Sequence, residues 1–124
     1  MPRTPEVRVR RVYDERERGD GARVLVDRIW PRGLSKEKAD LDDWCKLVAP
    51  STELRQWYGH DPERFEEFGR RYRVELEEPD RVEAFQQLSA TLKRGNLTLL
   101  TAAKRADISE AVVLAELLRD GSAS

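Results

Sequence analysis

A buried strand that ends abruptly is the feature that most constrains the fold of this chain. The β-branched run in Arg23-Val-Leu-Val-Asp-Arg-Ile29 predicts a strand covered on both faces, as in the centre of a parallel sheet. The segment Trp30-Pro31-Arg32-Gly33 follows at once, and its proline and glycine stop regular structure there. The chain must therefore supply other strands and helices that enclose this one.

The remaining segments predict those strands and helices. Strict alternation of apolar and basic residues at the start of Val7–Tyr13 predicts a half-exposed strand at an edge of the sheet. Further elements are expected over Lys36–Asp40 (helix), from Ser51 or Thr52 to Tyr58 (helix), from Asp61-Pro62 through Leu76 (helix), from Pro79-Asp80 to Gly95 (helix), over Leu97–Leu100 (strand) and from a capping box at Asp107–Glu110 through Leu118 (helix). This order predicts an α/β fold, a small single-domain layered structure with a mostly parallel central sheet flanked by helices.

The segment Asp42–Ala49 is ambiguous from its residues. Its apolar positions recur at helical spacing, which favours a helix. Pro50 then breaks the pattern. The choice between strand and helix stays open on these grounds.

The length of 124 residues predicts one domain. We expect a flexible N-terminus over residues 1–6, the domain over 7–120 and a flexible tail over 121–124. The apolar runs are far shorter than the ~20 residues that cross a bilayer. The first residues carry arginines and no apolar signal segment, so a cytoplasmic location is expected.

Charge is abundant but balanced. Charged residues form 38% of the chain, against a typical ~25%. The formal net charge is only -1, which argues against a dedicated nucleic-acid binder. One histidine and one cysteine cannot form a Cys/His zinc cluster, so no metal or other cofactor is expected. Cys45 is expected to be buried as a small hydrophobic residue.

The first candidate site lies where the buried strand ends. In open α/β sheets, ligands gather at the carboxyl ends of the strands. Arg28 and Arg32 are candidates to bind a phosphate or carboxylate, with Trp30 as a flat wall and Asp27 as a group that moves a proton. The alternative is an Asp–Arg ion pair beside a core tryptophan and a turn.

A second candidate segment, Thr101–Asp107, joins the last strand to the last helix. Lys104 and Arg105 stand near the positive end of that helix and could hold an anion. The alternative is a plain loop in which Asp107 caps the helix. If the two strands are neighbours, four cationic side chains would converge on one crevice.

His60 is the only imidazole in the chain and precedes a capped helix. It is the default general acid or base if a proton is transferred. A structural role beside the helix start is the alternative, because no nucleophile in the surrounding motif completes a dyad.

Four blocks of sequence resemble one family. Arg23–Lys36 resembles the signature of the YeaO-like branch of the domain-of-unknown-function 488 family. Ala49–Arg55 and Trp57–Pro62, with the aromatic residues that follow, look like the middle of that family, and Leu97–Ala103 looks like its closing strand. The resemblance spans nearly the whole chain and implies a small bacterial or archaeal α/β domain whose activity is not established.

The resemblance also carries over individual motif residues. These are Asp27, Arg28, Trp30, Pro31, Arg32, Gly33, Lys46, Arg55, His60 and Asp61, and Lys46 joins the candidate ligand-binding residues on this ground alone. The resemblance favours a strand over Asp42–Ala49. The chain departs from the family at Thr101–Ala103 and Asp107–Glu110, where the family has cysteine or histidine, so a thiol or imidazole mechanism from that loop is not expected.

Two hypotheses of function follow from the residues. The first is a site for an anionic small molecule, phosphate or nucleotide-like, at the strand ends; whether a reaction takes place there is left open. The second is a non-catalytic interaction or regulatory module that docks on a protein or nucleic-acid partner through the arginine-rich strand Val7–Tyr13.

Overall fold

Four parallel strands form the centre of the molecule. The computed structural model describes residues 4–122. The strands are β1 (Val7–Arg11), β2 (Ala22–Leu25), β3 (Asp43–Trp44) and β4 (Leu97–Thr101), in the order β1-β4-β2-β3 with every neighbouring pair parallel. The predicted α/β class is therefore confirmed, and β1 lies at an edge as its alternating pattern indicated.

Five α-helices and three short 3-10 helices surround this sheet in the described residues. The α-helices are α1 (Lys36–Ala39), α2 (Thr52–Tyr58), α3 (Phe65–Glu75), α4 (Pro79–Arg94) and α5 (Glu110–Ser122), and the 3-10 helices are η1 (Lys46–Val48), η2 (Pro62–Arg64) and η3 (Ala106–Ile108). Polar caps start several of them as predicted. Ser35 accepts a hydrogen bond from Lys38 N, and Ser51 accepts one from Leu54 N, each over 3.1 Å.

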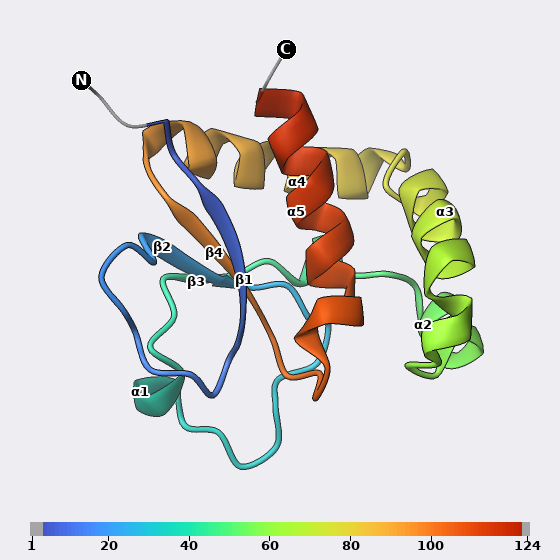
Figure 1. The fold of residues 1–124 in the computed structure, drawn as a ribbon, viewed down its shortest axis with the longest axis horizontal. Helices are drawn as coiled ribbons and strands as arrows, with labels where there is room; N and C mark the ends of the chain where they lie inside the picture. The colour runs from blue at the N-terminus through green and yellow to red at the C-terminus, as the bar shows by residue number, and fades with distance from the viewer. Residues whose placement is uncertain (1–3, 123–124) are drawn as a thin grey trace.

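The two faces of the sheet are covered differently. Val24, Val26 and Leu99 point into the main core, which is completed by apolar residues of α2–α5. Leu25 and Leu100 point to the opposite face, where they form a smaller core with α1 and the adjoining loops. Figure 1 shows α5 running alongside β1, with α4, α3 and α2 grouped together and α1 set apart from them. This alternation follows from the period-two geometry of strands.

Strand β2 ends earlier than the sequence predicts. The prediction extended it through Ile29, but the strand ends at Leu25 and the last bond to β4 runs from Val26 N to Leu100 O over 3.1 Å. Ile29 is 67% exposed. One residue after Val26, the Asp27 side chain takes up the backbone N–H of Ala102 over 2.8 Å, so a side chain replaces the ladder at this point. The loop after Val26 therefore has no strand alternation, and the strand expected through Ile29 is four residues shorter.

The ambiguous segment Asp42–Ala49 forms a short strand followed by a short 3-10 helix. Asp43 and Trp44 form the short strand β3, and η1 follows directly over Lys46–Val48. The preference for a strand holds only for its first residues. Trp44 packs in the smaller core and Val48 in the main core, so the change of backbone conformation lets one short segment serve both faces.

Helix α5 starts later than the capping-box pattern predicts. The chain forms η3 over Ala106–Ile108, and α5 begins at Glu110. Asp107 pairs with Arg105 over 2.8 Å, and the Glu110 carboxyl faces Asp27. The reciprocal contacts of a capping box are thus replaced by a local ion pair at Asp107 and by a tertiary approach of Glu110 to Asp27.

The ends of the domain are joined to its body. Glu6 N donates to Asn96 Oδ1 over 2.9 Å, and α5 continues to Ser122, beyond the expected domain limit at residue 120. Residues 1–3 and 123–124, which belong to the expected flexible ends, lie outside the described residues. Within 4–122, no helix has the length and apolar character that a membrane span requires. The cytoplasmic location stays a prediction.

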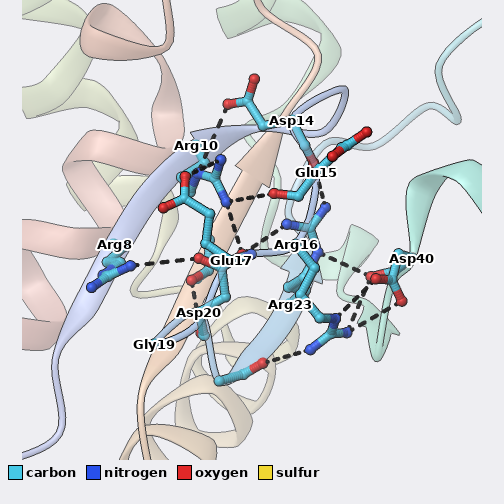
Figure 2. Close-up of polar contacts among 12 residues, drawn as sticks. Arg8, Arg10, Asp14, Glu15, Arg16, Glu17, Gly19, Asp20, Arg23 and Asp40 are labelled. Carbon is cyan, nitrogen blue, oxygen red and sulfur yellow. Dashed lines mark hydrogen bonds and ion pairs between the residues drawn. The ribbon is translucent and has the colours of Figure 1, made fainter.

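A buried ionic network, which we call the Asp20 network, holds the start of β2. Asp20 and Arg23 are both fully buried, and Arg23 Nη1 donates to Asp20 Oδ2 over 2.9 Å. Arg10 Nη1 donates to the same oxygen over 2.8 Å, and Arg8 approaches the other oxygen at 3.6 Å. Arg23 also donates to the carbonyls of Asp14, Ala39 and Asp40. Figure 2 shows how these guanidinium groups from β1 and β2 join loops far apart in the sequence.

The pKa of Asp20 follows from these contacts. Burial by itself would raise the pKa, but the hydrogen bond from Glu17 N and the guanidinium groups of Arg23 and Arg10 outweigh it and lower the pKa below its usual value. The carboxylate is therefore held in its charged form, as an internal counterion for the arginines around it.

Candidate functional site

A pocket of about 360 Å³ opens at the carboxyl ends of β2 and β4. We call it the strand-end pocket. Its lining comes from the end of β4, from the loops after β1, β2, β4 and η1, from α2 and the loop after it, and from the start of α5. The lining residues are Tyr13, Asp27, Arg28, Ile29, Trp30, Pro31, Arg32, Ala49, Arg55, His60, Thr101, Ala102, Ala103 and Glu110. Ligands of open parallel sheets bind at this end of the strands.

Asp27 anchors the floor of the pocket. Its Oδ2 atom accepts the hydrogen bond from Ala102 N, which ties the loop after β2 to the loop after β4. Its Oδ1 atom is buried, and none of the residues in 4–122 donates a conventional hydrogen bond to it. A buried carboxylate oxygen without a donor is costly, so a proton source is expected beside it.

Glu110, the first residue of α5, faces Asp27. Burial disfavours its charged form, and the Asp27 carboxyl adds both a hydrogen bond and electrostatic repulsion, so the pKa of Glu110 is raised well above its usual value. A hydrogen bond between two carboxyl groups requires a proton between them. A neutral Glu110 carboxyl can donate a hydrogen bond to Asp27, whose Oδ1 atom receives none from the other described residues.

Three arginines line the pocket without a carboxylate within 4.0 Å: Arg28 and Arg32 on the loop after β2, and Arg55 on α2. Arg28 and Arg32 are exposed. Arg55 Nη2 donates to Thr52 Oγ1 over 3.1 Å, while its Nε atom is buried and finds no acceptor in the described chain. These three side chains are therefore available to an anion.

This lack of pairing differs from most of the surface and interior. Ten other arginines of the described chain lie within 4.0 Å of a carboxylate: Arg8, Arg10, Arg16, Arg23, Arg64, Arg70, Arg71, Arg73, Arg81 and Arg105. In a chain with 24 acidic and 23 basic residues, three guanidinium groups without a carboxylate partner around one pocket are a local excess of positive charge.

Aromatic side chains form the walls. Trp30 is held by a hydrogen bond from its Nε1 atom to Leu34 O over 2.8 Å, and its ring lies 5.4 Å from Trp44 in an edge-on contact. His60 is exposed, has a left-handed backbone with φ of 58°, and lies 5.9 Å from the ring of Tyr58. Trp30 is thus a fixed surface, and the imidazole is free to meet a ligand.

The structure brings together five of the residues that the sequence nominated: Asp27, Arg28, Trp30, Arg32 and His60. It does not bring the other three to the same place. Lys46 lies over the ring of Trp44 at 5.2 Å and lines a separate pocket. Arg105 pairs with Asp107, and neither it nor Lys104 belongs to the lining of the strand-end pocket. Although β2 and β4 are neighbours, the expected convergence of all four cations is wrong.

Sequence reasoning missed two residues of the site. Glu110 matched the last position of a capping box, and that local pattern concealed its tertiary contact with Asp27. Arg55 was noted only as a motif residue of the family. A cation in the middle of a short capped helix gave no other signal that it would reach a pocket between two strands.

A slightly larger pocket, of about 400 Å³, lies near the start of β2 and along α4. Its lining includes Asp42, which is already bonded to Arg23 N and Arg16 Nη2 over 2.8 and 3.2 Å. The strand-end pocket is the better candidate because buried polar atoms without conventional partners, on Asp27 and Arg55, belong to its lining.

Metal and thiol chemistry find no geometric support in the part of the chain that is described. No group of three histidine, cysteine, aspartate or glutamate side chains there is arranged to hold a metal ion. Cys45 is buried as predicted, and burial, followed by the nearby Asp43 charge, raises its pKa to about 11. The thiol is therefore neutral and packed in the main core.

The fold and site define a small α/β protein with a charged pocket at the carboxyl ends of parallel strands. The chain belongs to the DUF488 family: the model described as "Inactive DUF488-N3 subclade" matches residues 6–124. The family resemblance of the sequence is thus confirmed.

Relatives cover nearly the full chain. The uncharacterised protein Rv3073c of Mycobacterium tuberculosis is 48% identical over 118 residues, which is 95% of this chain and 98% of the relative. The uncharacterised protein YeaO of Escherichia coli is 40% identical over 113 residues, covering 91% and 96%. No solved structure matches the chain.

Proposed function

We propose that this protein binds a small molecule with an anionic group, such as a phosphate, in the strand-end pocket. Arg28, Arg32 and Arg55 bind the anion. The observation that carries this proposal is that three guanidinium groups without a carboxylate partner line one pocket. Charge-assisted hydrogen bonds from arginine to phosphate are among the strongest polar contacts in proteins.

The dimensions and walls of the pocket support a small ligand. A volume of about 360 Å³ lies in the range of small-molecule sites. Trp30 offers an indole whose orientation is fixed by Leu34 O and Trp44. Tyr13 and Ile29 add partly exposed apolar surface at the rim, 47% and 67% exposed. A ligand with an anionic group and a flat or apolar portion fits this arrangement.

The proposal concerns binding and assigns no reaction. The matching subclade is described as inactive, which favours a binding role. Of the two sequence candidates for proton transfer, His60 contacts the ligand in this proposal, whereas the Asp27 carboxyl holds the pocket floor through its bond from Ala102 N. Cys45 lies in the main core and is not one of the residues that line the pocket.

The competing docking surface on β1 has less support. Arg8 and Arg10 are committed to Asp20, and Arg11 Nε donates to Ala103 O over 3.1 Å. The basic side chains of the edge strand therefore neutralise or bond groups of the same molecule. We favour a cytoplasmic small-molecule binder over a module that docks on nucleic acid through this strand.

The test is calorimetric titration of the full chain with inorganic phosphate and with a panel of nucleotides and sugar phosphates. We expect the parent to bind at least one of these anions at a single site. Arg32→Ala should weaken that binding about tenfold or more, because each charge-assisted hydrogen bond contributes about 1.5–3 kcal/mol.

Arg18→Ala is the matched control. Arg18 is exposed and does not line the pocket, so this variant makes the same change of net charge elsewhere. The proposal is overturned if the parent binds none of the anions, or if Arg32→Ala and Arg18→Ala weaken binding equally.

A further inference from the structure

The charge balance of the strand-end pocket points to a narrower class of ligand. We propose that the pocket selects the doubly charged phosphate group of a monoester over the singly charged group of a diester, because Asp27 and Glu110 share one proton. This inference rests on the proposed function. It concerns the terminal phosphate of a small molecule, as opposed to the internal phosphates of a nucleic-acid chain.

The surroundings of the two carboxyl groups favour a shared proton. Asp27 Oδ2 already accepts from Ala102 N, and Asp27 Oδ1 is buried without a conventional donor in residues 4–122. Glu110 lines the same pocket, and the nearby Asp27 carboxyl contributes to the rise of its pKa. Two ionised carboxylates in this position would repel each other and leave the buried oxygen unsatisfied. One proton removes both costs.

The shared proton sets the net charge that a ligand meets. Arg28, Arg32 and Arg55 contribute three positive charges, and the Asp27–Glu110 pair contributes one negative charge, which leaves an excess of two. A phosphate monoester carries about two negative charges above its second pKa of about 6. A diester carries one. The monoester dianion therefore neutralises the pocket, while a diester leaves one guanidinium charge uncompensated.

Several ionisable groups surround the pair and must be separated from it in an experiment. Arg55 and Tyr58 on α2 and Tyr72 on α3 act electrostatically on Glu110 or are acted on by it. Tyr58 and Tyr72 remain neutral in the useful range because burial raises the pKa of both, to about 12 for Tyr58 and well above the usual value for Tyr72. Arg28, Arg32 and His60 line the same pocket.

Calorimetry with methyl phosphate and dimethyl phosphate tests the inference, since the two probes differ by one charge and one methyl group. Near neutral pH the parent should bind methyl phosphate about tenfold or more tightly than dimethyl phosphate. Raising the pH until the Asp27–Glu110 pair loses its proton should weaken methyl phosphate binding. Glu110→Gln should keep its affinity at that pH, because its amide donates to Asp27 and cannot ionise.

Two further variants make the outcome decisive. Asp27→Asn places the amide on the other side of the pair and gives the same readout if Glu110→Gln does not fold. His60→Gln should retain the loss of affinity at high pH, which excludes the imidazole as its cause.

The possible failures are distinguishable. If both probes bind equally and Arg32→Ala weakens both, or if Glu110→Gln and Asp27→Asn follow the pH profile of the parent, the inference is wrong and the anion site stands. If neither probe binds and the phosphate panel of the first experiment also fails, the proposed function itself is wrong.

Discussion

Strand β2 has an aspartate shortly before its first residue and another shortly after its last. The side chains around these two aspartates carry opposite kinds of charge. Asp20 is fully buried and surrounded by guanidinium groups that lower its pKa. Asp27 faces another carboxyl group, Glu110, whose pKa is raised. At the start of the strand each buried charge meets an opposite charge. At its end, acid faces acid, and three arginines of the same pocket have no carboxylate within 4.0 Å.

The difference separates charges that hold the fold from charges available to a ligand. Arg23 is buried and donates from all three of its guanidinium nitrogen atoms to groups of the same chain, so its charge is not available to another molecule. Arg28 and Arg32 in the strand-end pocket are exposed. At the start of β2 even Asp20 Oδ1, which accepts no hydrogen bond, has the Arg8 guanidinium 3.6 Å away, so each charge has an opposite charge within the chain. A binding site instead keeps charged groups whose partners come from outside.

Removing the charge of each aspartate gives the largest expected contrast. Asp20→Asn should lower the free energy of unfolding by about 3–5 kcal/mol, because Arg23 is left buried without a counterion. Asp27→Asn should cost less than about 1 kcal/mol, since an asparagine can still accept from Ala102 N and can donate to Glu110. Urea unfolding of both variants measures the contrast. Equal losses for the two would remove the distinction between the two ends of β2.

A pair of glycines extends the contrast to the backbone. Gly21 follows Asp20 with φ of +62°, and a Cβ atom there would lie 2.1 Å from Asn96 O. Gly33 lies in the pocket loop with φ of +72° and has open space around it. Gly21→Ala should cost about 3 kcal/mol or more, because the carbonyl of Asn96 also pairs with Ala22 N. Gly33→Ala should cost only the left-handed backbone penalty, about 1–2 kcal/mol. Thermal unfolding of the two variants measures which loses more stability. A Gly21→Ala variant that is more stable than Gly33→Ala would contradict the close packing of Gly21 against Asn96.

The pH dependence of stability should have opposite signs at the two ends of β2. The folded pKa of Glu110 is raised, so its stabilising contribution is complete below the unfolded value of about 4.3 and is lost as the pH rises through the folded value. The folded pKa of Asp20 is lowered, so its contribution is present above about 3.9 and is lost as the pH falls through the folded value.

Glu110→Gln isolates the contribution of the pocket. At alkaline pH it should be more stable than the parent by on the order of 1 kcal/mol, and the advantage should vanish in acid. Urea unfolding across a series of pH values checks this. A variant that is less stable than the parent at alkaline pH would show that Glu110 is ionised without penalty, and the two ends of β2 would then differ less than described.

Much of the fold could be predicted from local patterns. The buried run after Arg23, the edge pattern of Val7–Arg11 and the serine caps of α1 and α2 each follow from short-range chemistry, and all were found. The boundaries that failed are those where a side chain from elsewhere intervenes. Asp27 takes the N–H of Ala102 and ends the ladder, and Glu110 turns to Asp27 instead of to its own helix end.

Only the part of the candidate site that is contiguous in the sequence could be predicted. The cluster from Asp27 to Arg32 is contiguous in the sequence, so its density of charge was visible. Arg55 and Glu110 come from distant helices, and nothing local marks them as neighbours of Asp27. Lys104 and Arg105 show the reverse error, because proximity in sequence to the end of β4 did not bring them into the strand-end pocket.

The sequence by itself determined the class of fold, the buried strand and the abundance of balanced charge, because these depend on residue type and on periodicity within a segment. Only the tertiary structure decided which charges are paired. Pairing depends on distances between segments and on burial, which set whether a carboxyl group meets an arginine, as at Asp20, or another carboxyl group, as at Asp27.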